Sequence, residues 1–403
     1  MTRRWIVVAL IFVGIVISYV DRGNLGIAAP SIMKEFGFQP DSMGLLLSAF
    51  FWTYGFFQIP AGAIIDRMGI RTVYACGFLL WSLASSAIGF SHGLAGILVL
   101  RLLLGLAESV GPIASNSFIR RNFADEEVGL PIAIYIGGQN LGPALGTLVG
   151  TQLIAHLGWR ALFILTGLGA LVWLPFWLWF APRNDARRAE TAPPLRLSGE
   201  TVRLRAFWAL PLCIFLSSYF WYFLLNWVPT YLTSSRGFST TGMGRVLSIP
   251  LFAMAAINIV AGYIADKVVH RVGSVFRVRL WFCAAGYIGS GALLLLLIVK
   301  DRALVMPVLL IAVCATGIGN ANFWAIAQSV APATVVGRVI GYLNTISQMA
   351  GAAAPLITGW ILGPRQEFGV ALAIAGVSAP LAAACLLSTG VGGLERMRKA
   401  LLP

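Results

Sequence analysis

The stretch GAIIDRMGIR at residues 62–71 places an acid, two arginines and two glycines directly after a long apolar segment. A second version of this stretch, GYIADKVVHR, occupies residues 262–271 and also follows an apolar segment. The two versions share a glycine, an aspartate, a basic residue and a final arginine at the same spacing. This internal repeat predicts that the chain is built from two related halves.

The composition predicts a membrane protein. Of 403 residues, 58% are hydrophobic and 11% are charged, against about 25% charged in a typical soluble domain, and the mean hydropathy is +0.84. A soluble chain of this length could not bury so much apolar surface. The five Cys and three His show no paired or ligand spacing, and no Ser/His pair lies in the predicted core. We therefore expect no metal, no organic cofactor and no enzyme activity.

Twelve apolar segments reach the ~20 residues that a bilayer requires of a helix. Backbone groups cannot stay unpaired in hydrocarbon, so these segments are predicted to be helices. The expected fold class is an all-α polytopic membrane protein, with twelve transmembrane helices in two six-helix pseudo-repeats around a central cavity. The predicted spans are 5–30, 42–64, 72–91, 94–119, 128–155, 160–181, 206–233, 241–265, 276–299, 303–330, 336–362 and 367–390.

The distribution of basic residues predicts the orientation in the membrane. With twelve spans both termini lie on one side, and most of the 29 Lys and Arg residues fall in segments on that side. Positive charge marks cytoplasmic segments, so we expect both termini in the cytoplasm and the chain in a bacterial inner (plasma) membrane. Because topology accounts for most of the net charge of +14, we expect no nucleic-acid partner. We also expect the chain to lie in the lipid bilayer as a monomer.

The longest polar segment, PRNDARRAETAPPLRLSGETVRLR at 182–205, separates spans six and seven. We predict an N-terminal six-helix bundle at 1–181, a cytoplasmic linker at 182–205 and a C-terminal six-helix bundle at 206–403. Parallel repeats of six spans are one of the known designs of secondary transporters.

These features resemble the major facilitator superfamily. The motif at 62–71, the six-plus-six hydropathy and GWRALF at 158–163 carry the resemblance over nearly the whole chain. Within it, YVDRGNL at 19–25, QIPAGAIIDRMGIR at 58–71 and RLLLGLAES at 101–109 are similar to the anion:cation symporter family. That family includes bacterial permeases for hexonates and hexuronates, and the animal sialin and vesicular glutamate transporters.

The motif at 62–71 is predicted to form a conformational latch. Gly69 suits a short turn, and Asp66 can accept from helix-end amides and pair with a nearby arginine. We expect such a latch to affect the cycling between conformations and not the choice of substrate. The predicted latch residues are Gly62, Asp66, Arg67, Gly69 and Arg71.

Four charged residues lie inside predicted spans: Asp21 and Arg22 in span one, and Arg101 and Glu108 in span four. Neighbours in a helix point about 100° apart, so Asp21 and Arg22 each need another partner. An isolated charge at the bilayer centre costs ~2.5–3.5 kcal/mol or more. At ~1.5 Å of rise per residue the four charges fall at overlapping depths, so the two signs can compensate. Ionisable residues at such depth indicate function.

The chemistry of these residues predicts anion binding coupled to protons. Arg22 stays charged and offers a planar fork that suits a carboxylate. Asp21 and Glu108 are the predicted proton-coupling residues, and they can exchange protons if burial favours their neutral forms. A protonated acid lets an anion approach, whereas a charged acid competes with the anion for the arginines. The second half is expected to supply polar side chains and no comparable buried charge. The predicted substrate-binding residues are Tyr19, Arg22, Arg101, Gln139, Tyr219, Tyr222, Asn226, Asn320, Trp324, Asn344 and Gln348.

The family resemblance implies the same roles. It implies that Tyr19, Arg22 and Gln139 touch the substrate, and that the acids of spans one and four carry protons. Sugar-acid members have asparagine where Gln348 stands, which leaves the identity of the anion open.

Span five contains Gly138, Gly142, Gly146 and Gly150 at intervals of four. Small residues at this spacing allow another helix to approach closely. The pattern also resembles a span-five motif of drug/proton antiporters, but helix packing is the favoured interpretation.

The sequence thus predicts a secondary active transporter that takes up a small organic anion with protons by alternating access. The expected anion is a monocarboxylate sugar acid, such as a hexonate or hexuronate, and protons are the coupling ion. The alternative is a proton-coupled antiporter that exports amphipathic drugs or metabolites, although a cationic drug site favours an unpaired acid. A membrane sensor is a third interpretation, and it would be expected to carry a large soluble extension.

Overall fold

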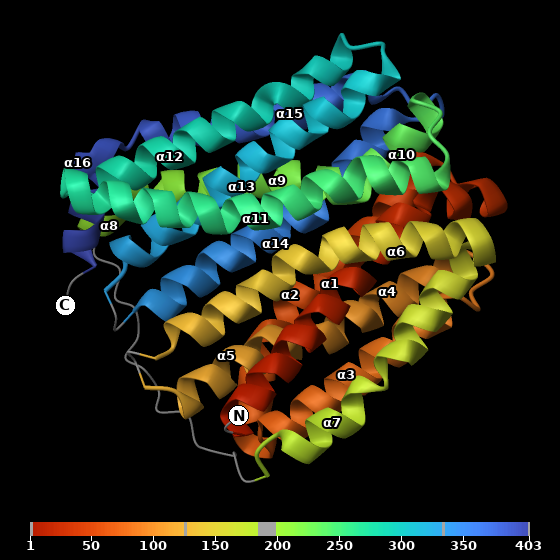
Figure 1. Ribbon diagram of the computed structural model, residues 1–403, viewed down its shortest axis with the longest axis horizontal. Coiled ribbons are helices and arrows are strands. Elements are labelled where there is room, and N and C mark those ends of the chain that lie inside the picture. Colours follow the sequence, from red (N-terminus) through yellow and green to blue (C-terminus); the bar gives the residue numbers. More distant parts are fainter. Residues whose placement is uncertain (1–2, 125–126, 184–198, 333–334, 402–403) are drawn as a thin grey trace. The chain divides into compact units, whose positions relative to one another are not determined.

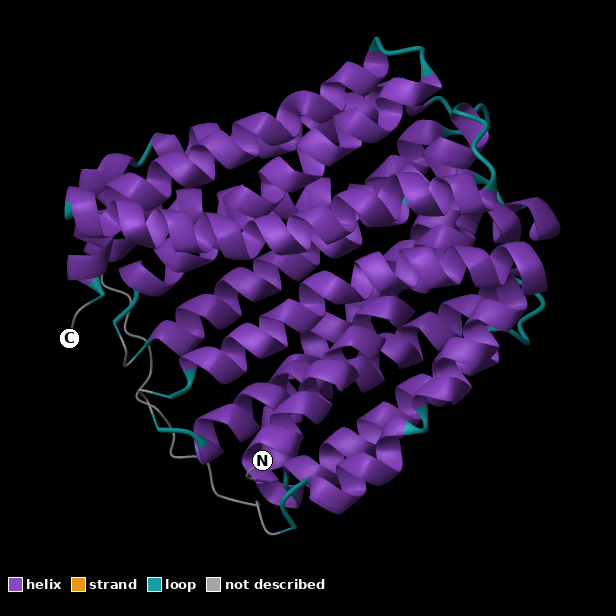
Figure 2. Cartoon of the chain, in the orientation of Figure 1, coloured by secondary structure: helices purple, strands orange, loops and turns teal. Residues whose placement is uncertain are grey.

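The fold is all-α. The computed structural model describes residues 3–124, 127–183, 199–332 and 335–401, and in these ranges it contains helices and short connections without a β-strand (Figures 1 and 2). The predicted fold class is therefore confirmed. Most of the predicted linker, residues 184–198, lies outside the described residues.

The helices account for the twelve predicted spans. Nine helical stretches of the described chain are long and apolar enough to cross a membrane. One of them, Gly129–Phe180, contains both predicted spans five and six, because its backbone turns at Gly158, where φ is 84°. Helices α3 (Ile70–Ile88) and α14 (Val336–Leu362) supply the two remaining spans.

Packing divides the chain into two compact units. Unit 1 comprises Met1–Glu190, Leu225–Ser248 and Pro355–Gln366, and unit 2 comprises Thr191–Leu224, Ile249–Ala354 and Glu367–Pro403. This division follows contacts between residues and not the covalent order of the spans. The predicted six-helix bundles at 1–181 and 206–403 stay a prediction.

Unit 1 is organised around its first helix. In Figure 1, α1 runs beside α6, and α3 lies beside α7. Helices α2 and α3 both pack against α4, and Glu108 at the end of α4 contacts Ser18 and Arg22 of α1. The elements within unit 1 are α1 (Arg3–Phe36), α2 (Pro40–Met68), α3, α4 (Leu94–Glu108), α5 (Val110–Asn122), α6 (Gly129–Ala170), α7 (Trp173–Phe180), α10 (Val228–Thr230) and the π-helix η1 (Tyr231–Ser235).

The glycine stripe of span five explains the close packing of α6 on α1. A Cβ atom at Gly142 would lie 2.5 Å from the Cβ of Tyr19 and 2.9 Å from the carbonyl oxygen of Val16. At Gly146, a Cβ atom would lie 3.2 Å from the Cα of Val20. Only residues without side chains fit against a neighbouring backbone at this distance. The helix-packing interpretation of the stripe is confirmed.

Unit 2 packs α12 against both α13 and α15. The predicted span at 276–299 starts as an α-helix and continues as a 3₁₀-helix from Gly291. The elements within unit 2 are α8 (Gly199–Arg203), α12 (Val275–Ser290), η2 (Gly291–Leu297), η3 (Arg302–Leu304), α13 (Val305–Val330), α15 (Phe368–Leu387) and α16 (Gly390–Ala400).

Three helices contribute residues to both units: α9 (Arg205–Asn226), α11 (Thr240–Val272) and α14. The change of unit falls close to a helix end or a proline in each case. In α9 the boundary follows Leu224, two residues before the helix ends. In α11 unit 2 begins at Ile249, directly before Pro250. In α14 unit 1 begins at Pro355.

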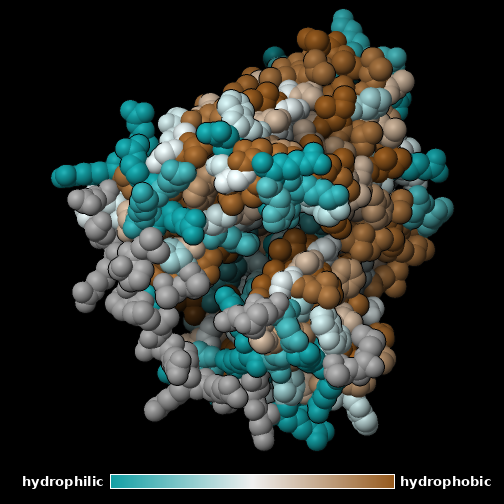
Figure 3. All heavy atoms as spheres, turned by 60° about the vertical axis from the view of Figure 1, so that its left-hand side comes forward, coloured by the Kyte–Doolittle hydropathy of each residue, from teal (hydrophilic) through white to brown (hydrophobic). Residues whose placement is uncertain are grey.

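The surface of the protein is apolar over wide areas. Phe56 is 78% exposed, Ile59 83% and Trp360 80%, and hydrophobic side chains gather on the right-hand side of Figure 3. Monomeric soluble proteins rarely expose contiguous apolar areas of this kind. Together with the hydropathy of the helices, this surface indicates a protein that spans the lipid bilayer many times.

Candidate functional site

The charged residues of α1 and α4 meet inside unit 1. The guanidinium Nη2 of Arg22 lies 3.1 Å from Oε2 of Glu108, and the two side chains are 6% and 0% exposed. The hydroxyl of Ser18 donates to the same carboxylate oxygen at 2.8 Å. Because Ser18 is four residues before Arg22, both lie on one face of α1. The sequence thus places a donor and a cation together on the acid of α4.

Aromatic rings surround the guanidinium of Arg22. Its Cζ atom lies 4.6 Å from the ring centroid of Tyr19, 4.7 Å from that of Phe50 and 4.5 Å from that of Tyr54. The negative face of an aromatic ring attracts a cation, by about 0.5–2 kcal/mol for each favourable contact. Three rings from α1 and α2 therefore fix the position and orientation of this guanidinium within a buried site.

Asp21 points to a different set of neighbours. Its Oδ1 accepts from the hydroxyl of Ser85 at 3.1 Å and from the amide of Asn24 at 3.3 Å. The same amide of Asn24 donates to the hydroxyl of Thr166 at 2.9 Å. Oδ2 of Asp21 is buried without a hydrogen-bond partner among the described residues. Asp21 and Arg22 are adjacent in sequence but belong to separate polar networks, as the helical geometry predicts.

Arg101 lies near this cluster without a direct ion pair among the described residues. Its side chain is buried, and its Cζ atom lies 5.2 Å from the ring centroid of Phe50. Nε and Nη1 of Arg101 have no hydrogen-bond partner in the part of the chain that the structure describes. Both arginines contact Phe50, so this ring links the two cations of unit 1.

Gln139 lies next to Gly138, a member of the glycine stripe by which α6 packs on α1. Its amide nitrogen donates to the hydroxyl of Tyr135 at 3.1 Å. The adjacent residue, Gly138, packs against Ile15 and the backbone of Phe12. Gln139 is half-buried and is held by Tyr135 and not by Arg22 or Glu108.

In unit 2 the predicted polar residues form hydrogen-bonded pairs. The hydroxyl of Tyr222 donates to Oε1 of Gln348 at 3.0 Å, and the amide of Gln348 donates to Oδ1 of Asn344 at 3.4 Å. Tyr287, which the sequence did not single out, donates to Oδ1 of Asn320 at 3.0 Å. The structure thus brings Tyr222, Gln348 and Asn344 together, and a further tyrosine orients the amide of Asn320.

The three other predicted residues of this group are Tyr219, Trp324 and Asn226. Tyr219 is buried within α9, and Trp324 is half-buried beside the ring of Phe323. Asn226, the last residue of α9, belongs to unit 1, where its Cα would lie 3.2 Å from a Cβ atom at Gly26. Asn226 therefore packs closely on α1.

The expectation that the second half holds no comparable buried charge is wrong. Arg279 of α12 is 9% exposed. It pairs with Asp266 of the second motif through Nη2, and its Nη1 donates to Oδ1 of Asn322 at 3.1 Å. From the sequence, a basic residue in the first turns of a span is expected to lie at the membrane surface. The sequence around Arg279 does not show its burial, because its partners come from two other helices, α11 and α13.

Comparison with known proteins decides the family. Residues 11–355 match the Major Facilitator Superfamily. The chain belongs to this superfamily. The match spans both halves of the chain and confirms the resemblance carried by the repeated motif.

Members of the superfamily with similar sequences are named as transporters of sugar acids. The chain is 28% identical over 407 residues to the D-galactonate transporter of Escherichia coli O6:H1, covering 94% of this chain and 93% of the relative. It is 30% identical over 396 residues to the hexuronate transporter of Bacillus subtilis, covering 92% and 90%. These relatives confirm the predicted kinship with hexonate and hexuronate permeases. The superfamily and these relatives are transporters and not enzymes.

A solved structure agrees with the superfamily fold. The crystal structure of a bacterial homolog to the human lysosomal transporter Spinster, in an inward-facing and unoccupied conformation, matches with a TM-score of 0.77 at 16% identity. The match covers 100% of this chain and 98% of the other. It supports the fold alone.

The superfamily motif at 62–71 forms a compact connection between α2 and α3. Gly69 adopts a φ of 83°, a left-handed backbone that favours glycine. Oδ1 of Asp66 pairs with Nη2 of Arg121 at 2.7 Å, and Arg71 donates twice to the carbonyl oxygen of Leu178, at 2.6 and 3.0 Å.

The other two predicted latch residues make looser contacts. Arg67 is exposed, and the nearest atom to a Cβ at Gly62 would be 3.9 Å away, on Ile113. The motif therefore ties α2 to α5 and α3 to α7 within unit 1.

Proposed function

We propose that this chain is a proton-coupled symporter that takes up a monocarboxylate sugar acid, such as a hexonate or hexuronate. It works as a monomer with both termini in the cytoplasm of a bacterial inner membrane. The two predicted six-helix bundles alternate the access of the site between the two sides. The observation that carries the proposal is the buried pair of Arg22 and Glu108 within its frame of three aromatic rings.

The carboxylate of a substrate can take the place of Glu108 on the guanidinium of Arg22. A planar guanidinium can grip one carboxylate with two parallel hydrogen bonds. Oε2 of Glu108 lies 3.1 Å from Nη2 of Arg22, so the acid takes the place that a substrate carboxylate would need. The rings hold the guanidinium in place when its partner changes, so the carboxylate of a sugar acid replaces Glu108 without a large cost of reorganisation.

Protonation of Glu108 would couple this exchange to the proton gradient. When Oε2 of Glu108 gains a proton, the residue loses its charge and its attraction to Arg22. The freed guanidinium then binds the substrate anion, and the proton and the anion occupy the site together. Asp21 offers a second proton site, because its own network with Ser85 and Asn24 does not include Arg22.

The predicted amides and tyrosines offer hydrogen-bonding groups for the hydroxyls of the substrate. Tyr19 and Gln139 in unit 1, and Tyr222, Asn320 and Gln348 in unit 2, present donors and acceptors that suit a polyhydroxylated chain. The related D-galactonate and hexuronate transporters support this substrate class. Tyr219, Asn226, Trp324, Asn344 and Arg101 complete the proposed set.

The proposal is tested by Glu108→Gln in proteoliposomes that contain D-galactonate or D-glucuronate. Glutamine keeps the size of the side chain and imitates the protonated acid, but it cannot release a proton. We expect the variant to exchange substrate in counterflow and to fail to accumulate it under an imposed pH difference. Asp21→Asn is expected to show a separate coupling defect, because the two acids lie on different helices.

Glu127→Gln is the matched control. Glu127 pairs with Arg4 at 2.8 Å, and both side chains are more than a third exposed, so its loss should leave accumulation unchanged. Accumulation by Glu108→Gln at the parent level would show that Glu108 is only a structural partner of Arg22, and would refute its place in coupling.

A further inference from the structure

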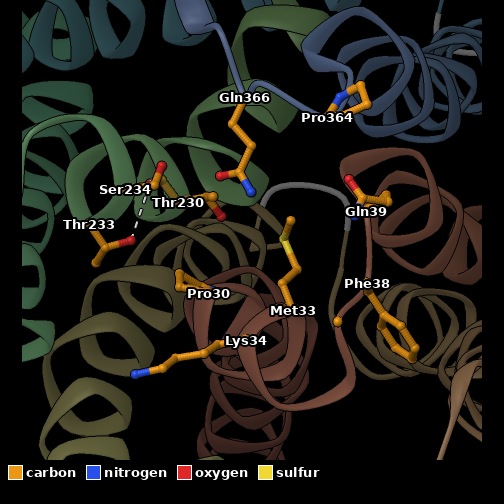
Figure 4. A pocket seen from close by; sticks show the side chains of 11 residues that line it. Pro30, Met33, Lys34, Phe38, Gln39, Thr230, Thr233, Ser234, Pro364 and Gln366 are labelled. Atoms are coloured by element: carbon orange, nitrogen blue, oxygen red, sulfur yellow. Dashed lines mark hydrogen bonds between the residues drawn. The ribbon is translucent and has the colours of Figure 1, made fainter.

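Unit 1 contains a pocket at the C-terminal end of α1. It has a volume of about 460 Å³ and lies where α1 ends, α2 begins and η1 follows α10. Figure 4 shows side chains from these elements and from the turn after α14 around the opening. The lining residues are Pro30, Met33, Lys34, Gly37, Phe38, Gln39, Thr230, Thr233, Ser234, Pro364 and Gln366.

The described lining residues of this pocket are mostly polar, and none of them is an acid. Three hydroxyls and two amides line the pocket together with Lys34, whose flexible side chain carries the only formal charge among the described lining residues. The volume lies in the range of small-molecule sites, roughly 300–1,000 Å³. One cation and several uncharged donors in a concave site favour a small anion that also carries hydroxyl groups.

Thr230 offers a hydrogen-bonding group that the protein leaves unused. The residue is 2% exposed, and its Oγ1 has no hydrogen-bond partner among the described residues. Its neighbours differ, since the hydroxyls of Thr233 and Ser234 donate to the carbonyl oxygen of Thr230 at 3.1 and 2.7 Å. A buried hydroxyl without a partner costs about 1–3 kcal/mol, and a ligand hydroxyl in the pocket would remove this cost.

The backbone around the pocket is irregular in two places. Tyr231–Ser235 forms a π-helix, a rare element that often occurs at functional sites. Gln366 has a φ of 51°, which few residues other than glycine adopt. Figure 4 shows the side chain of Gln366 extending into the pocket from the wall beside Thr230. Ser234 and Gln366, one from each of these two segments, both line the pocket.

We propose that this pocket is a second binding site for a small hydroxylated carboxylate, separate from the cluster around Arg22. The carboxylate binds near Lys34, and the hydroxyls meet Thr230, Ser234 and Gln366. Lys34 follows Arg22 by twelve positions on α1, or about 18 Å along the helix, so one small ligand cannot occupy both places. The inference rests on the proposed function for its ligand class, and it assigns the transported anion a site outside the Arg22 cluster.

Cysteine protection tests this site in the purified full chain. In a background without the five native cysteines, Ser234→Cys places a thiol in the lining, and Ser235→Cys places one next to it outside the lining. Both serines are exposed, so a maleimide reagent should label both variants. At ten times its Kd, D-galactonate or D-glucuronate should slow labelling at Ser234→Cys about tenfold by simple occupancy and leave Ser235→Cys unchanged.

Two additions separate the pocket from the Arg22 cluster. Protection of Ser234→Cys should persist when Arg22→Lys is added and should weaken when Lys34→Gln is added. Galactitol, which has hydroxyls but no carboxylate, should give no protection. Protection that disappears with Arg22→Lys would mean that the thiol only senses occupancy of the other site, and equal protection by chloride would mean a general anion site. Either result overturns the proposal.

The outcomes also distinguish this inference from the proposed function. Sugar acids that raise the unfolding temperature of the parent but never protect Ser234→Cys would overturn the pocket and leave the symporter standing. Protection that persists with Arg22→Lys, in a parent that does not transport sugar acids, would support the pocket and overturn the symporter.

Discussion

Replacing Arg22 with lysine is the most direct test of how the anion is held. Lysine keeps the charge, but its ammonium lacks the planar fork and cannot form two parallel hydrogen bonds with one carboxylate. A hydrogen bond to a charged group is worth about 1.5–3 kcal/mol. Losing one such bond predicts a Kd for the sugar acid that is higher by roughly 10- to 160-fold.

The structure also explains why lysine is a better test than alanine. Removing the cation altogether would leave Glu108 buried without its partner, which costs about 3–5 kcal/mol of stability. Lysine can still pair with Glu108 and still attracts the rings of Tyr19, Phe50 and Tyr54. The variant should therefore fold, and its unfolding temperature without ligand serves as the control.

The assay is equilibrium binding of D-galactonate or D-glucuronate to purified protein, followed by titration calorimetry. Tyr54→Phe keeps the ring beside the guanidinium and should leave the Kd within a few-fold of the parent. A Kd for Arg22→Lys within twofold of the parent, at unchanged stability, would refute a direct grip of this arginine on the carboxylate.

Three further predictions concern the surroundings of the site. Gly142→Val should lower the unfolding temperature, because overpacking against Tyr19 costs about 1–3 kcal/mol. Gly137→Ala is the control, because its Cβ would meet nothing closer than 4.0 Å. Equal unfolding temperatures of the two variants would contradict the close packing of α6 on α1. Gly69→Cys should slow transport while the Kd stays within a few-fold, since a φ of 83° disfavours a side chain; a large loss of affinity at a normal transport rate would show that the latch interpretation is wrong. Tyr222→Phe should raise the Kd roughly 2- to 12-fold by removing one neutral hydrogen bond, and binding that matches the parent would remove this tyrosine from the site.

The sequence predicted the unit 1 cluster because buried charge is costly in a bilayer. Asp21, Arg22 and Glu108 could be found from their types alone, and the helical angle between Asp21 and Arg22 predicted that they would have different partners. Phe50 and Tyr54 could not be found in this way. They sit in an apolar segment where aromatic residues are ordinary, and only the packing of α2 beside α1 places their rings on the guanidinium.

The limits of the prediction in unit 2 have the same origin. Arg279 lies near the start of its span, where a basic residue is expected to reach water, so nothing in the local sequence indicates burial. Its partners Asp266 and Asn322 come from two other helices. The pocket beside Thr230 was missed for a similar reason, since its polar groups come from three separate segments and none of these has a recognisable motif.

The prolines near the unit boundaries give the long helices a mechanical role. A proline inside a helix removes one backbone hydrogen bond and crowds the preceding turn, so the helix bends there more easily than elsewhere. In α11 and α14, Pro250 and Pro355 stand where the packing partners of the helix change from one unit to the other. A bend at either proline would change the direction of the helix and leave the side-chain packing on both sides of the proline intact.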